Sequence, residues 1–168
     1  MMSGYLDSLR ASEPAPILVL GLGNTLLSDD GVGPAILDHL SSSSQRWEGR
    51  VEFVDGGTQG LALLGRLSGR KALIIVDAVK TGAPPGTVHR MTLNELRSAN
   101  PGRAGSAHEG NAGELLAAAQ LVDELPERLF VVGVEPKKIA TGHGLSDAVK
   151  CALPEASQEV HQLLTQLC

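Results

Sequence analysis

The chain has 168 residues, a net charge of −5 and 42% hydrophobic residues, so we expect one globular domain over residues 1–168, with residues 1–15 as a flexible N-terminal extension. Its apolar runs fall short of the roughly 18 residues that a membrane-spanning helix needs, and its lysines and arginines are too scattered for a nucleic-acid footprint. The two cysteines, Cys151 and Cys168, form neither a disulfide framework nor a metal motif. A cytoplasmic protein is the simplest interpretation.

Continuous apolar runs alternate with segments whose apolar residues recur at helical spacing, which predicts an alternation of buried strands and helices. One segment, 86–92, follows two prolines and carries polar residues, as an edge strand does. In chain order we predict a strand over 17–20, a helix over 33–42, a strand over 51–54, a helix over 58–67 capped by Thr58, a strand over 72–76, an edge strand over 86–92, a loop over 98–107, a helix over 109–121, a strand over 129–134 and a helix over 155–167.

This alternation predicts an α/β fold, with a mostly parallel sheet and helices on both faces. The edge strand over 86–92 follows its predecessor after a short connection, so we expect it to be antiparallel. Ligands of such folds bind outside the carboxyl ends of the strands, near the point where the strand order reverses. We therefore expect the functional residues in the segments that follow the strands, which are 21–31, 55–58, 77–82 and 135–143.

The segment after the first strand, 21–31, is rich in glycine and ends with two adjacent aspartates. It has no third glycine of a dinucleotide fingerprint and no lysine of a P-loop, and the aspartates would repel a phosphate. An acidic pair after a glycine-rich turn suits a cation better. We expect Asp29 to cap the next helix, which leaves Asp30 free for a ligand.

Two further residues complete a candidate site. Asp77 directly follows the apolar run 72–76, where a carboxylate is costly unless it is paired or bound. His108 lies between a flexible loop and the start of a helix, which could place it over the strand ends. We expect His39, His89 and His161 to be solvated surface residues. Two carboxylates and one imidazole form a mixed oxygen and nitrogen site for Ni²⁺, Zn²⁺ or Mn²⁺.

The string Gly21-Leu-Gly-Asn-Thr-Leu-Leu-Ser-Asp-Asp-Gly-Val-Gly33 resembles the opening motif of the nickel–iron hydrogenase maturation proteases. Four later pieces match the family in order. They are Asp55-Gly-Gly-Thr-Gln-Gly60, Leu-Ile-Ile-Val-Asp77-Ala78, Val131-Val-Gly-Val-Glu-Pro136 and His143-Gly-Leu145. The likeness extends from about Ile17 to the C-terminal helix.

The resemblance implies a flavodoxin-like three-layer fold and a cytoplasmic endopeptidase of the aspartyl type. Members remove a C-terminal extension from the large-subunit precursor of a nickel–iron hydrogenase after nickel has been inserted. Their metal-contacting residues correspond to Asp30, Asp77 and His108, although some members have Glu where this chain has Asp30. The nickel would then be carried by the substrate rather than by the isolated protein, which we expect to be monomeric.

On this hypothesis Asp30, Asp77 and His108 reach nickel that the cysteines of the substrate still hold, and an aspartate with a raised pKa could act as general base. No serine lies in a Gly-x-Ser-x-Gly elbow and neither cysteine lies in a recognised catalytic loop, which argues against a serine or cysteine protease. Two alternatives stay open: a nickel-sensing or chaperone module that binds the large subunit without cutting it, and a metallopeptidase that holds its own catalytic ion.

Overall fold

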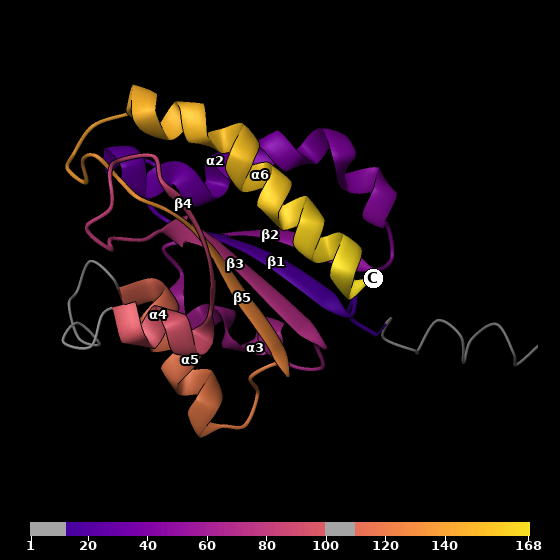
Figure 1. Cartoon of the computed structure of the whole chain (residues 1–168). Coiled ribbons are helices and arrows are strands. Elements are labelled where there is room, and N and C mark those ends of the chain that lie inside the picture. Colours follow the sequence, from indigo (N-terminus) through magenta and orange to yellow (C-terminus); the bar gives the residue numbers. More distant parts are fainter. Residues whose placement is uncertain (1–12, 100–109) are drawn as a thin grey trace, which may run out of the picture.

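The computed structural model describes residues 13–99 and 110–168, and its centre is one five-stranded sheet (Figure 1). The strand order is β2-β1-β3-β5-β4, and all neighbours are parallel except β4, which runs antiparallel to β5 at the edge. The strands are β1 Ile17–Leu22, β2 Val51–Gly57, β3 Ala72–Ala78, β4 Val88–Thr92 and β5 Arg128–Val134. The predicted mostly parallel sheet with an antiparallel edge strand is confirmed.

Helices cover both faces of this sheet, so the predicted three-layer architecture is confirmed as well (Figure 1). The α-helices are α2 Val32–Leu40, α3 Leu64–Leu67, α4 Leu93–Ala99, α5 Gly110–Leu121 and α6 Asp147–Leu167, and the 3-10 helices are η1 Ser28–Gly31, η2 Ser41–Trp47 and η3 Gly60–Leu63. Helices α2 and α6 lie on one face, and α3, α4 and α5 on the other. None of the helices in the described ranges is long and apolar enough to cross a membrane.

The central strand β1 explains why continuous apolar runs mark this fold. Its side chains alternate between two aliphatic cores, because successive residues of a strand point to opposite faces. Ile17 and Val19 pack into the core under α2 and α6, while Leu18, Leu20 and Leu22 pack into the core under α3 and α5. All six residues of β1 are buried, so neither face leaves room for a polar side chain.

Two helices differ from their predicted bounds for identifiable reasons. Helix α6 begins at Asp147, eight residues before the predicted start, and contains Pro154. Proline disfavours a helix interior, but the extra turns bury Val149 and Ala152 in the core. The predicted cap at Thr58 is wrong: the segment forms two short helices, η3 and α3, and the residue before η3 is Gln59 without a side-chain cap.

Helix α4 lies between the predicted edge strand and the predicted loop and was not expected. Its start has the reciprocal hydrogen bonds of a capping box. The carboxylate of Glu95 accepts from the Thr92 N–H at 2.7 Å, and the Thr92 hydroxyl oxygen accepts from the Glu95 N–H at 3.3 Å. The Thr-x-x-Glu spacing would have predicted this start. Most of the predicted loop over 98–107 and nearly all of the N-terminal extension over 1–15 lie outside the described residues.

In the sheet β2 lies next to one edge of β1, and β3 lies next to the other edge. The strand order therefore reverses between β1 and β3. The backbone just past β1 turns tightly against η1 there. Gly23 has a φ of +132°, and a Cβ atom at this position would lie 1.8 Å from the carbonyl oxygen of Asp30. Only glycine fits between the end of β1 and η1.

We predict that Gly23→Val lowers the free energy of unfolding by about 4 kcal/mol or more, the range reserved for severe steric mechanisms. The matched control is Gly49→Val, because Gly49 also has a positive φ, +75°, but a Cβ there meets nothing within 4 Å. That variant should lose only about 1–2 kcal/mol, the usual cost of left-handed backbone. Denaturant unfolding measures both, and equal losses would show that the turn after β1 can relax.

Candidate functional site

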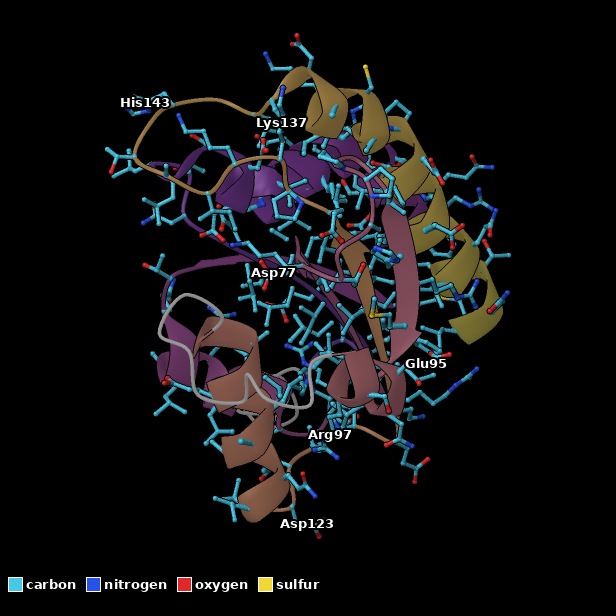
Figure 2. All side chains as sticks on the ribbon, turned by 60° about the vertical axis from the view of Figure 1, so that its left-hand side comes forward. Asp77, Glu95, Arg97, Asp123, Lys137 and His143 are labelled. Carbon is cyan, nitrogen blue, oxygen red and sulfur yellow. The ribbon has the colours of Figure 1, made fainter. Side chains whose placement is uncertain are left out.

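The two candidate aspartates lie at the carboxyl ends of β1 and β3, which are neighbours in the sheet. Asp30 belongs to η1, directly after β1, and its Oδ2 accepts a hydrogen bond from the Asn24 N–H at 2.9 Å. Asp77 is the last residue but one of β3, and its Oδ1 accepts from the Ala78 N–H at 2.8 Å. Both side chains are half-buried. Figure 2 shows Asp77 at the end of the sheet, between the two helical layers.

These two carboxylates interact electrostatically. Burial, followed by the negative charge of Asp30, raises the pKa of Asp77 to about 7, and the hydrogen bond from Ala78 offsets only part of this effect. A carboxyl group with such a pKa can accept a proton near neutral pH. A cation placed between the two aspartates would remove the repulsion, so the pair can also bind a metal.

The third predicted ligand, His108, lies outside the described residues. Within 13–99 and 110–168, no group of three His, Cys, Asp or Glu side chains could hold a metal ion. Both cysteines are exposed and free: Cys151 lies near the start of α6, and Cys168 directly follows its end. The described part of the site is therefore a pair of carboxylates.

The neighbouring aspartate, Asp29, has a different role from the predicted one. It does not cap the following helix, since α2 has no side-chain cap. Its fully buried carboxylate instead accepts hydrogen bonds from the N–H groups of Lys137, Lys138 and Ser146 and from the Ser146 hydroxyl, at 2.6–3.0 Å. Burial raises the pKa of Asp29, but these hydrogen bonds outweigh it and hold the pKa below its usual value.

The backbone adds to this connection between η1 and the segment after β5, residues 135–146. Ser28 donates its N–H to the Gly142 carbonyl at 2.9 Å and its hydroxyl to the Ala140 carbonyl at 2.9 Å, and Gly142 donates its N–H to the Leu26 carbonyl at 3.0 Å. Asp30 is thus carried by a short helix that is bonded to a distant part of the chain. Its position depends on tertiary contacts as much as on the turn after β1.

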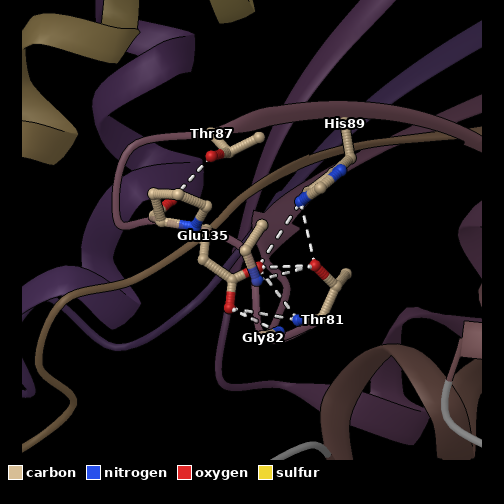
Figure 3. Close-up of polar contacts among 7 residues, drawn as sticks. Thr81, Gly82, Thr87, His89 and Glu135 are labelled. Atoms are coloured by element: carbon tan, nitrogen blue, oxygen red, sulfur yellow. Dashed lines mark hydrogen bonds and ion pairs between the residues drawn. The ribbon is translucent and has the colours of Figure 1, made fainter.

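A second buried carboxylate was not singled out from the sequence. Glu135 is 5% exposed and accepts hydrogen bonds from Thr81 and Gly82, just beyond Asp77 (Figure 3). His89 lies 3.4 Å from Glu135 Oε2 and 3.2 Å from the Thr81 hydroxyl, so the expectation of a solvated residue is wrong there. It is also wrong for His161, which is half-buried, lies 3.0 Å from the Ser43 hydroxyl and stacks on Trp47. A glutamate directly after a buried strand is the signal that could have drawn attention to Glu135.

The comparison with protein families agrees with this geometry. The family model described as "HycI: Hydrogenase maturation protease" matches residues 35–163, most of the chain. The chain belongs to the hydrogenase maturation protease family. It is therefore a hydrolase that cleaves peptide bonds, and the resemblance found in its motifs is confirmed.

Individual relatives match over nearly the whole described chain. The "Hydrogenase 2 maturation protease" of Escherichia coli K12 is 36% identical over 148 residues, which cover 86% of this chain and 87% of that protein. The "Hydrogenase expression/formation protein HupD" of Thiocapsa roseopersicina is 33% identical over 153 residues, covering 89% of this chain and 68% of that protein. The solved structure of the hydrogenase maturating endopeptidase HybD from E. coli has a TM-score of 0.77 at 32% identity, covering 89% and 92% of the two chains.

We predict that Asp29→Ala lowers the free energy of unfolding at pH 7 by on the order of 3 kcal/mol, because it leaves several buried donors without an acceptor. The folded-state pKa of Asp29 lies below its unfolded value, so its contribution is present above about pH 4 and disappears as the pH falls through the folded pKa. Denaturant unfolding should therefore show a smaller difference in acid. Asp38→Ala, at an exposed position of α2, is the control, and an equal loss in both variants would contradict the role of Asp29.

We predict that Asp77→Asn raises the melting temperature at pH 8 and leaves it unchanged near pH 4.5. The folded-state pKa of Asp77, about 7, lies above its unfolded value, so the ionised side chain destabilises the fold progressively between about pH 4 and 7. Asparagine keeps the acceptor for the Ala78 N–H without the charge. Thermal melts of metal-free protein at the two pH values measure the effect, with Asp38→Asn as control. A pH-independent difference would mean that the charge of Asp77 is not the cause.

Proposed function

We propose that this chain is a nickel-dependent endopeptidase, which removes a C-terminal extension from the large-subunit precursor of a nickel–iron hydrogenase after nickel insertion. One observation carries the proposal beyond the family: Asp30 and Asp77 lie at the same end of the sheet, where burial and, after it, the charge of Asp30 raise the pKa of Asp77. Two carboxylates held together in this way favour a cation. A metal on the substrate would supply that cation only when the precursor is ready for processing.

The proposed mechanism begins with recognition. Asp30, Asp77 and His108 contact the nickel that the cysteines of the precursor hold, a mixed set of oxygen and nitrogen donors that suits this metal. Contact with the nickel orients the peptide bond to be cleaved, and a bound metal of this kind also polarises a carbonyl or activates water. Precursor without nickel would leave the carboxylates unpaired and bind in the wrong geometry.

The aspartates have a second task in the proposed reaction. A general base works best when its pKa is near the working pH, and in the metal-free protein burial and the charge of Asp30 raise the pKa of Asp77 to about 7. We therefore assign the acceptance of a proton from the attacking water to Asp77, with Asp30 as the group that tunes its pKa. We further propose that the protein acts in the cytoplasm as a monomer.

The test is mass spectrometry of a candidate precursor, with and without nickel, incubated with the protein. We predict cleavage of the nickel-loaded precursor alone. Asp30→Ala, Asp77→Ala and His108→Ala should each slow it by at least about tenfold, the loss that follows even when an outer partner of a metal ligand is removed. Circular dichroism should show an intact fold in each variant.

Matched controls for these substitutions lie next to each other on α2. Asp38 and His39 are exposed, so Asp38→Ala and His39→Ala remove the same side chains at positions away from the strand ends and should cleave normally. Full cleavage by His108→Ala would remove that residue from the site. Cleavage of nickel-free precursor at the same rate would contradict the dependence on nickel.

The two alternatives give different results. A nickel-sensing module would bind the nickel-loaded precursor without shortening it. A metallopeptidase with its own ion would be isolated with one stoichiometric metal that survives a chelator, whereas we predict metal-poor protein that takes up Ni²⁺ or Zn²⁺ only at raised concentration. Three side chains from separate segments must be ordered to bind a free ion, which weakens the affinity. Elemental analysis and titration calorimetry of the isolated protein distinguish these cases.

A further inference from the structure

The carboxylate of Glu135 accepts hydrogen bonds from the start of the connection between β3 and β4, residues 79–87. The Thr81 N–H donates to Oε2 at 2.9 Å, the Thr81 hydroxyl donates to Oε2 at 2.9 Å, and the Gly82 N–H donates to Oε1 at 3.1 Å. His89 approaches Oε2 from the edge strand, so the carboxylate is surrounded by donors (Figure 3). Burial raises the pKa of Glu135, but these hydrogen bonds outweigh it and lower the pKa below its usual value.

The main chain of Glu135 holds the other end of the same connection. Its N–H donates to the Thr87 carbonyl at 2.9 Å, and its carbonyl accepts from the Gly86 N–H at 2.8 Å. A single residue thus bonds to both ends of the turn over 81–87. The turn itself is built on backbone that favours glycine, since Gly82 and Gly86 have φ values of +88° and +84°.

This connection begins only two residues after Asp77. In the sheet Asp77 pairs with Gly133 and Ala78 with Val134, and the Val79 N–H donates to the Val134 carbonyl at 3.0 Å. The side chain of Glu135 then continues the contact between β3 and β5 past the end of the regular strands. Hydrogen bonds from Val79, Thr81 and Gly82 thus hold this segment against the end of β5 and Glu135.

We infer that Glu135 is a positioning residue of the endopeptidase: it fixes the segment Val79–Gly82, so that the end of β3 presents Asp77 to the substrate in one orientation. The inference rests on the proposed role of Asp77. Glu135 does not touch the reacting atoms and acts through the backbone. Displacements of about 1 Å in a catalytic group can reduce a rate by about a hundredfold, so a loosened segment should slow turnover more than it weakens binding of a large protein substrate.

The experiment is steady-state cleavage of nickel-loaded precursor by Glu135→Gln, with amide hydrogen exchange on the same protein. Glutamine has the same shape, but its NH₂ group faces N–H donors and cannot accept from them. We expect kcat to fall about tenfold with KM within about twofold. The amides of Thr81 and Gly82 should exchange faster, while those of α6 stay unchanged. A purely structural role would lower the melting temperature and leave kcat per folded molecule as it was.

Glu95→Gln is the matched control. Glu95 also accepts from the N–H and the hydroxyl of a threonine, Thr92, at 2.7 and 2.9 Å, but it is exposed and far from Asp77 in Figure 2. We expect this variant to keep its kcat. If Glu135→Gln does not fold, Thr81→Val removes the hydroxyl alone at an exposed position and should still lower kcat by about two- to threefold.

The outcomes separate the two proposals. An unchanged kcat in Glu135→Gln, or in Thr81→Val where the first variant does not fold, overturns the positioning role, and so does an equal loss in Glu95→Gln. If the wild-type protein leaves every nickel-loaded precursor uncut, the proposed function fails instead. Hydrogen exchange at Thr81 and Gly82 then still reports whether Glu135 fixes the segment, and unchanged exchange overturns that part by itself.

Discussion

Two like charges at the ends of adjacent strands dominate the chemistry of this protein. Burial of Asp77, together with the nearby charge of Asp30, makes ionisation of both groups unfavourable in the folded state and raises the pKa of Asp77 to about 7. Groups that repel each other would move apart if their segments were free to do so. The surrounding structure prevents this, because β3 is packed between β1 and β5 and η1 is bonded to the segment after β5.

Three buried or half-buried carboxylates near the site have pKa values that are shifted in opposite directions. Asp29 and Glu135 are each surrounded by hydrogen-bond donors, and the pKa of each is lowered. Their charges are stabilised, and they act as fixed points that hold η1 and the β3–β4 connection against residues 135–146. Asp77 has one backbone donor, from Ala78, and a raised pKa. Asp29 and Glu135, whose carboxylates are fully hydrogen-bonded, therefore hold the segments around the site in place. Asp77, which has fewer donors, is available for a proton or a metal, as expected of a functional group.

Some features followed from local sequence, and others did not. The apolar runs predicted the parallel strands, because a strand buried on both faces is largely apolar, and the polar segment after two prolines predicted the edge strand β4. Predicted helix starts were less reliable. The last helix begins eight residues before the predicted start and buries Val149 and Ala152 there, and the capping box at Thr92 and Glu95 was overlooked. Asp30 and Asp77 could be selected because parallel strands end at the same edge of a sheet. The place of His108 at the site stays a prediction.

The sequence by itself determined the layers of the fold and the two strand ends that carry the carboxylates, since both follow from hydrophobic periodicity and the order of the elements. Only the tertiary structure decided which partners each acidic residue has, and with them the direction of its pKa shift. Asp29 and Asp30 are neighbours in the chain, yet Asp29 bonds to residues more than a hundred positions away, while Asp30 lies close enough to Asp77 to change its pKa. The physical reason is that the free energy of a buried charge depends on the donors and charges around it, and these come from segments that only folding brings together.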